Sequence, residues 1–206
     1  MQIEKPLPYF DAEAVRARSI EEQMRSWRKF NSETFGVEFE EEGFKIPPAR
    51  DGFGRVLMMA QGITLESILA ESRKRFKVEA CFNDPNAAIE KNDRDNLDSS
   101  YAVMVRHRFV CDDNLLGHSA EENERLGKRG MTLKERLLLG LKVHKETGLH
   151  LDPKYVTRCE GTSYVGGEVP TVAWWHKDQT LKIGWSSYSG SKHFIGGREV
   201  VEASAS

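Results

Sequence analysis

The chain has 206 residues, and its 30 Lys and Arg residues against 32 Asp and Glu residues give a formal net charge of -2. This balance excludes the global positive field that dominates non-specific nucleic-acid binding, and the hydrophobic fraction of 39% excludes a disordered composition. The length allows one substantial core, with roughly 70% of the unfolded surface buried. We therefore expect a single globular domain over residues 1–206, helix-rich over 1–150 and β-rich over 151–201, with a frayed tail at 202–206.

The cysteines and the N-terminal segment indicate the compartment. Cys81, Cys111 and Cys159 are an odd number of thiols without a CxxC pair, which favours a reducing compartment over a disulfide framework. The first residues, MQIEKPLPYF, lack an apolar signal core, and no run approaches the roughly 20 apolar residues that a membrane-spanning helix needs. We expect a cytoplasmic protein without a membrane partner.

Two helices and a weak strand are predicted near the start of the chain. Asp11 can cap a first helix after a proline-rich lead. Ser19 and Glu22 form a capping box that opens a second helix, and Gly36 should end it. The VEFEEEGFKIPP segment that follows alternates in polarity, which predicts an edge strand that the two prolines stop.

The middle of the chain alternates between strand and helix signals. RVLMMA is either a buried strand or the approach to a helix. Thr64 should cap a helix that continues to about Phe76, and KVEACF should form the next strand. Residues 83–100 are polar and contain Pro85, which predicts a long loop. SYAVMVRHRF then predicts a further strand.

The clearest helix signal runs from Gly130 to Gly148. A short helix that Ser119 opens should precede it. Thr132 and Glu135 form the capping box of the long helix, and Gly148 can adopt the left-handed conformation that ends it. The apolar arc is broad, which predicts a central helix covered on much of its circumference. Its members are Leu133, Leu137, Leu138, Leu139, Leu141 and Val143.

The last quarter of the chain has β character. YVTRCEG, TVAWWH and TLKIGW are short and rich in β-branched and aromatic residues, which predicts an antiparallel meander with a hairpin at residues 177–179. A Gly/Ser-rich loop, SSYSGSKHFIGG, and a last strand at REVV follow. The predicted fold class is α+β, with helices packed on a mainly antiparallel sheet and a C-terminal β-meander.

Two segments with related sequences suggest an internal repeat. GITLE at 62–66 and GMTLK at 130–134 each open a capped helix that leads to a strand with a cysteine, Cys81 or Cys159. This similarity suggests a duplicated helix-strand-strand unit. The alternative is that G-x-T-L is simply a good helix start.

One candidate activity is that of a cysteine hydrolase, peptidase-like, with Cys159 as nucleophile. Such an enzyme needs a histidine base within hydrogen-bond reach, here His150 or His176, and a group such as Asp152 or Glu160 to orient it. Cysteines are more often buried core residues, and a strand lacks the helix N-terminus that commonly lowers a thiol pKa. A structural role for Cys159 is therefore the stronger interpretation.

A metal site is a weaker candidate. His144, His150 and Asp152 bracket the end of the long helix and could supply two imidazoles and a carboxylate. The spacing differs from HExxH and requires the loop to fold back. We therefore expect no metal and no cofactor.

Aromatic and basic residues indicate a binding surface. Single strands of nucleic acid are bound by phosphate contacts and by stacking of bases on aromatic rings. Adjacent Trp174 and Trp175 should point to opposite sheet faces, so at least one of them belongs to the core. The candidate binding residues are Trp174, Trp175, Trp185, Tyr188, Arg106 and Arg108.

Four stretches carry a family resemblance: GMTLKERLLLGLK through TGLHLD, TRCEGTSY, GEVPTVAWW and KPLPYFDAEAVRARSIEEQ. In these the chain is similar to a recurrent family of small hypothetical proteins predicted in the genomes of uncultivated, small-genome bacteria. The resemblance covers most of the chain and implies a cytoplasmic bacterial protein, but it carries over no catalytic residue. SSYSGSKHFIGG departs from the family pattern.

These observations favour a binding module over an enzyme. The expected function is recognition of a macromolecule, with single-stranded nucleic acid as one form of partner, through the aromatic C-terminal sheet and the loop at 186–197. The cysteine hydrolase is the alternative function.

Overall fold

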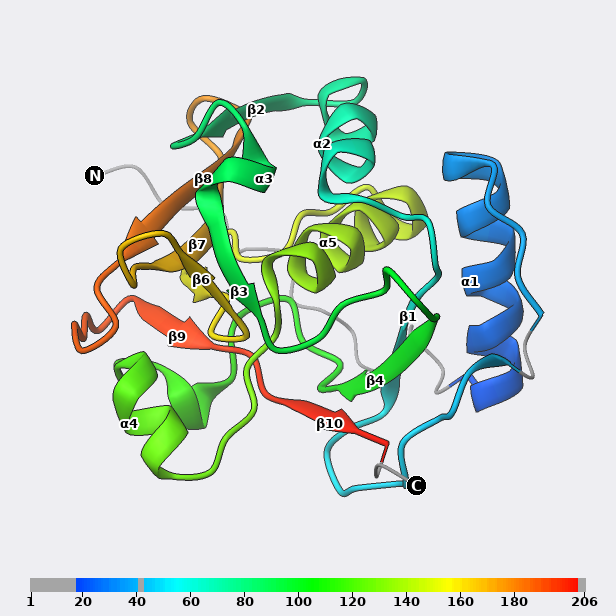
Figure 1. Cartoon of the computed structure of the whole chain (residues 1–206), viewed down its shortest axis with the longest axis horizontal. Coiled ribbons are helices and arrows are strands. Elements are labelled where there is room, and N and C mark those ends of the chain that lie inside the picture. Colours follow the sequence, from blue (N-terminus) through cyan, green and yellow to red (C-terminus); the bar gives the residue numbers. More distant parts are fainter. Residues whose placement is uncertain (1–17, 41–42, 204–206) are drawn as a thin grey trace, which may run out of the picture.

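A computed structural model describes residues 18–40 and 43–203 of the chain (Figure 1). The helix expected after Asp11 lies outside these residues. The α-helices are α1 Ile20–Phe35, α2 Leu65–Arg73, α3 Pro85–Ala88, α4 Ala120–Arg125 and α5 Leu133–Thr147, and a short 3-10 helix, η2, spans Asp113–Leu115. The strands are β1 Arg55–Met59, β2 Lys77–Ala80, β3 Ile89–Asn92, β4 Tyr101–Val105, β5 Val156–Arg158, β6 Thr162–Tyr164, β7 Val169–Trp175, β8 Thr180–Ser186, β9 Ile195–Gly197 and β10 Val200–Glu202.

Helix α5 lies in the middle of the molecule (Figure 1). The hydroxyl of Thr132 accepts from the Glu135 N–H at 3.2 Å, and the Glu135 carboxylate accepts from the Thr132 N–H at 2.7 Å, which is the predicted capping box. Gly148 ends the helix at φ 72°. The predicted apolar arc is buried, and four charged residues of α5 are buried with it: Lys134, Glu135, Arg136 and Lys142.

Helix α1 has the predicted Ser19–Glu22 capping box and ends at Gly36 with φ 67°. It is fastened to β1 because the Trp27 indole N–H donates to the carbonyl of Val56 at 2.8 Å. The edge strand expected after α1 is wrong, since residues 37–40 and 43–48 form no strand. Their apolar side chains pack on the core instead, with the Phe39 and Phe44 rings 4.8 Å apart.

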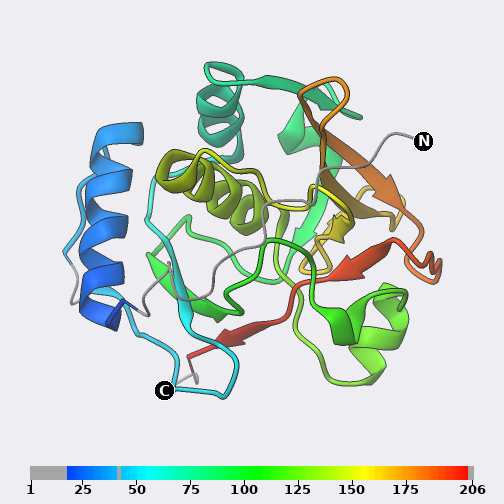
Figure 2. The ribbon, with the colours of Figure 1, turned by 180° about the vertical axis from the view of Figure 1, so that it is seen from behind.

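The strands form a mainly antiparallel arrangement of three sheets with the orders β1-β4-β10, β2-β8-β7-β5-β9 and β3-β6. The β7–β8 hairpin turns where the sequence predicts it, because Trp175 pairs with Thr180. Two ladders in the five-stranded sheet are parallel, β2 with β8 and β5 with β9. The last residues of the chain link the two larger sheets, since β9 belongs to one and β10 to the other (Figure 2). The fold class is therefore α+β, as predicted.

Residues 83–100 are not the predicted uninterrupted loop, because they contain α3 and β3. The Asp84 carboxylate caps α3 by accepting from the Asn86 N–H at 2.9 Å, and Pro85 occupies the first turn. Sheet order gives no support to a duplicated unit. After α2, β2 and β4 belong to different sheets, whereas after α5, β5 and β7 are neighbours in one sheet.

One hydrophobic cluster contains residues from α1 to β10, with Leu137 and Leu141 of α5 inside it. Glu202, the first residue of the tail expected at 202–206, is not frayed, since it ends β10 and its carboxylate accepts from Arg94; residues 204–206 lie outside the described residues. Among the helices in residues 18–40 and 43–203, none has the length and apolar character needed to cross a membrane.

Candidate functional site

The predicted aromatic surface is divided between the two faces of the five-stranded sheet. Trp175 pairs with Thr180 and Trp185 pairs with Pro170, five ladder positions away. Because side chains alternate between faces along a strand, Trp175 and Trp185 point to opposite faces. Trp175 is 50% and Trp185 60% exposed. The two rings therefore cannot form one stacking platform on a single sheet face.

Trp174 belongs to the core, which confirms the prediction that at least one of the adjacent tryptophans is a core residue. It is 4% exposed. Its ring stacks on the imidazole of His150, with centroids 3.3 Å apart and planes 4° apart, and meets Phe76 edge-on at 5.6 Å. Trp174 therefore packs β7 against the segments that follow α5 and α2, and it does not belong to a binding surface.

Trp175 lies on the outer face within a group of balanced charges. The Lys182 ammonium lies 4.4 Å from the centre of the Trp175 ring, a distance at which a cation is attracted to an aromatic face. The same ammonium lies 3.4 Å from the Glu79 carboxylate and 3.6 Å from that of Asp178, while Lys77 also pairs with Glu79. Lys182 is thus the charged residue over the exposed ring, and ion pairs connect it to Glu79 and Asp178 and, through Glu79, to Lys77.

The Gly/Ser-rich segment expected to be a loop over 186–197 is a loop only over 187–194, because Ser186 ends β8 and Ile195–Gly197 form β9; this loop is anchored by Arg158, which is buried in β5. The Arg158 guanidinium donates to the carbonyl of Gly190 at 2.8 Å and to that of His118 at 2.7 Å. The Tyr188 carbonyl accepts from the Ala120 N–H at 3.1 Å, at the start of α4. The loop is therefore fastened to α4 and to the sheet, and it leaves the Tyr188 ring partly exposed at its tip.

The two predicted basic contacts are engaged elsewhere. The Arg106 guanidinium donates to Asp112 at 2.7 Å and to Glu199 at 2.9 Å, and Arg108 pairs with Asp113. Both arginines follow β4 of the three-stranded sheet. No interaction among the described residues joins either arginine to Trp175. The expected single surface of these cations and the aromatic sheet is therefore not formed.

The residues of the predicted hydrolase do not meet. Cys159 is fully buried, and burial raises the pKa of its thiol, which opposes formation of the thiolate nucleophile. His150 is held in the stack with Trp174, and its pKa falls to about 3 because burial disfavours the cation. His176 is exposed in the β7–β8 turn. In residues 18–40 and 43–203 no hydrogen bond joins Cys159 to a histidine.

Thiol reactivity offers a direct check on Cys159. We expect iodoacetamide at pH 7.5 to modify only Cys81 in the folded protein, because Cys81 is exposed whereas Cys111 and Cys159 are buried. Burial also raises the pKa of Cys111 to about 12. Peptide mass spectrometry with and without denaturant would measure this pattern. Rapid modification of Cys159 in the native protein would contradict it and revive the hydrolase.

The three residues considered as metal ligands serve other roles. The His144 and His150 rings stack with centroids 4.3 Å apart. The Asp152 carboxylate pairs with two buried guanidinium groups, those of Arg136 and Arg198, each at 2.7 Å. Within the described part of the chain, no group of three His, Cys, Asp or Glu side chains could hold a metal ion.

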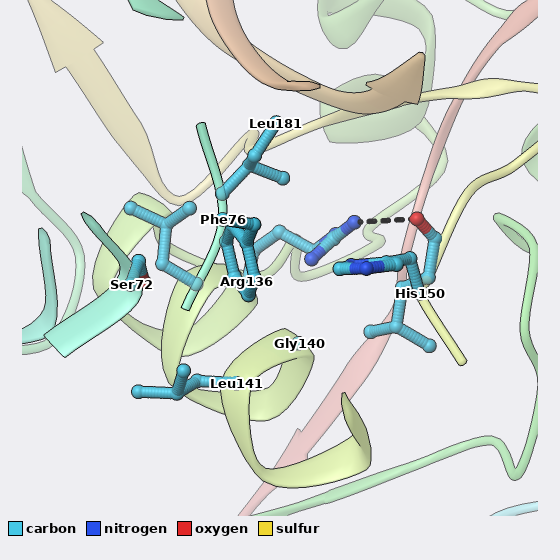
Figure 3. A pocket seen from close by; sticks show the side chains of 9 residues that line it. Ser72, Phe76, Arg136, Gly140, Leu141, His150 and Leu181 are labelled. Atoms are coloured by element: carbon cyan, nitrogen blue, oxygen red, sulfur yellow. Dashed lines mark hydrogen bonds between the residues drawn. The ribbon is translucent and has the colours of Figure 1, made fainter. Parts of the chain in front are cut away.

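A small cavity beside this charged group is too small for a substrate. It lies between α2, α5 and β8, is lined by Phe76, Arg136, His150 and Leu181 among others, and has a volume of about 10 Å³. Figure 3 shows the Arg136 side chain extending past the His150 ring to the carbonyl of Leu151. This volume holds about one water molecule.

A larger cavity is a cleft that sequence reasoning missed. It has a volume of about 680 Å³ and lies between the start of α2, strand β3 and the segment at 95–97, and this volume is typical of ligand sites. The cleft was missed because residues 83–100 read as a loop. Asp84 before Pro85, a helix-start signal, could have indicated the turn that carries the chain into β3.

Comparison of the chain with family models, with curated proteins and with solved structures gave no match.

Proposed function

We propose that this protein is a binding module that recognises a partner macromolecule through the exposed end of the β7–β8 hairpin, residues 175–179, with Trp175 as the anchor. The observation that carries this proposal is a half-exposed tryptophan held on a regular β-ladder with the Lys182 ammonium over its ring. Tryptophan is enriched among the residues that contribute most to binding, and such residues are commonly surrounded by polar groups.

The charges around Trp175 favour a protein partner over nucleic acid. The Lys182 ammonium over the ring is paired with both Glu79 and Asp178, and Lys77 also pairs with Glu79. Single-stranded nucleic acid is held mainly by an excess of positive charge along the groove. A balanced rim instead suits a protein surface with its own mixture of charges.

The cellular setting is part of the same proposal. All three cysteines are free thiols, as expected in a reducing compartment. The resemblance to a bacterial family supports a cytoplasmic bacterial protein. No arrangement of the described residues favours the hydrolase as a second function.

Replacing Trp175 with alanine tests the proposal. We expect the Trp175→Ala variant to lose partners that the wild-type protein captures by crosslinking in cell extract, because an aromatic anchor commonly contributes at least 2 kcal/mol, or about thirtyfold in affinity. Trp185→Ala is the matched control, since it removes an exposed tryptophan from the opposite face. Quantitative mass spectrometry of the captured proteins would compare the three forms.

Two outcomes would contradict the proposal. One is an identical set of captured proteins for the wild type and Trp175→Ala. The other is salt-dependent binding of a labelled oligothymidine that disappears in Trp175→Ala, which would replace the protein partner with single-stranded nucleic acid.

A further inference from the structure

The cleft beside β3 is a second binding site, distinct from the Trp175 face. We propose that it binds an extended segment of a partner protein that carries basic side chains, and that this segment adds to β3 as a new strand. Recognition of this kind combines main-chain hydrogen bonds to a sheet edge with pockets for alternate side chains. The inference goes beyond the proposed function because it concerns another sheet and another class of contact.

The first support is an open strand edge. Among the described residues β3 pairs with β6 alone, in an antiparallel ladder that joins Ile89 to Tyr164 and Asn92 to Thr162. All four residues of β3 line the cleft. A strand with one partner presents backbone N–H and C=O groups along its other edge. The cleft therefore runs beside a template for one more strand.

The second support is a rigid floor and far wall. The buried Asn96 amide donates to the carbonyls of Ala60 at 2.6 Å and Ile63 at 2.9 Å, which holds the segment at 95–97 against the lead into α2. The buried Lys134 ammonium extends from α5 to the Asn96 amide oxygen and to the Asp95 carboxylate. Because these contacts hold the 95–97 segment to the lead into α2 and to α5, an incoming strand would meet a preformed surface on that side of the cleft.

The third support is the charge that remains. Lys134 is balanced by Asp95, and Lys91 is balanced by Asp93 at 3.2 Å. Glu66 and Glu90 also line the cleft, and neither forms an ion pair with any described residue. The unbalanced charge of the cleft is therefore negative, which complements lysine or arginine side chains on the bound segment.

The fourth support is an apolar contribution to the cleft wall. Leu97 lines the cleft with 73% of its surface exposed and Ile89 is half-buried in it, whereas the lining residues Ile63 and Leu65 are buried beneath. Successive side chains of an extended peptide point to opposite sides. A segment that alternates basic and apolar residues would place both kinds against matching walls.

A labelled octapeptide of alternating lysine and valine, blocked at both ends, is the probe for this site. We expect saturable binding by fluorescence anisotropy, and slower amide hydrogen exchange at 89–92 when the peptide is bound. Glu90→Lys should weaken binding about tenfold or more because attraction becomes repulsion. Glu40→Lys, an exposed glutamate after α1, is the matched control and should bind as the wild type does.

Backbone methylation separates strand addition from simple charge attraction. The same peptide methylated on alternate backbone nitrogens keeps its side chains but cannot pair along one edge, so we expect it to bind about tenfold more weakly. Circular dichroism would confirm that each variant is folded.

Three results would overturn the inference: no binding of the lysine–valine peptide, equal binding by Glu90→Lys, or equal binding of the methylated peptide. The test is independent of the Trp175 face. Peptide binding that is lost in Trp175→Ala but retained in Glu90→Lys would place the peptide on the sheet and reject the cleft.

Discussion

Replacing Asp152 with asparagine is expected to destabilise the fold by about 3–5 kcal/mol, the usual cost of leaving a buried charge without its partner. The buried Asp152 carboxylate is the charged partner of the Arg136 and Arg198 guanidinium groups, which lie on α5 and between β9 and β10. It also accepts from the Thr157 hydroxyl at 2.6 Å. Asparagine keeps the size of the side chain and removes the charge that holds the two cations.

Asparagine is the informative substitution because backbone conformation is nearly unchanged by it. Asp152 has φ 57°, in the left-handed region that asparagine tolerates better than most residues. Any loss of stability is therefore attributable to the lost charge and to the acceptor oxygen that the amide nitrogen replaces, since both Asp152 oxygens accept hydrogen bonds.

Urea unfolding followed by circular dichroism would measure the change at pH 7. Asp113→Asn is the matched control, since Asp113 pairs with Arg108 at the surface and such pairs contribute about 0–1 kcal/mol. A loss at Asp152 no larger than that of the control would contradict the prediction.

Helix limits were predictable from the sequence because their signals are local. Ser19, Thr64, Ser119 and Thr132 each cap the helix that they were expected to open. A capping residue and its partner are three positions apart, so the sequence alone contains the whole interaction. The β7–β8 hairpin was predictable for the same reason.

Strand partners and the candidate site were less predictable because they depend on distant residues. Lys77 pairs with Thr180 in the parallel β2–β8 ladder, and no turn signal links the two segments. The group around Asp152 brings together α5 and the strand-linking residue Arg198. The cleft needs α2, β3 and α5 to meet. Such contacts follow from the packed fold and have no signature in a short window of sequence.

The second large effect concerns Glu160, whose charge is poorly compensated. Its side chain is 6% exposed and lies 3.8 Å from the Arg158 guanidinium. One carboxylate oxygen accepts from the Asn123 amide at 2.8 Å, whereas the buried Oε2 atom has no hydrogen-bond partner. Burial therefore raises the pKa of Glu160 to about 7 from its ordinary 4.5. The folded protein favours the protonated acid.

A raised carboxyl pKa makes folding less favourable as pH rises. Below about pH 4.5 Glu160 is protonated in both states, and between 4.5 and 7 the unfolded chain ionises first. The stability contributed by the protonated acid is thus lost as pH rises through 7. The difference between the folded and unfolded pKa values of Glu160 corresponds to about 3 kcal/mol of unfolding free energy, since each pKa unit is about 1.4 kcal/mol.

Glu160→Gln is expected to remove this penalty. Glutamine retains an acceptor for Asn123 and carries no charge at any pH. We therefore expect the free energy of unfolding of the variant to exceed that of the wild type by about 3 kcal/mol at pH 8 and to equal it at pH 4. Urea unfolding at a series of pH values would give the difference curve, in which ionisations shared by both proteins cancel. A stability difference that does not change with pH, or a variant less stable than the wild type at pH 8, would contradict the prediction. Either result would show that Arg158 fully compensates the Glu160 charge even though the Oε2 atom has no hydrogen-bond partner.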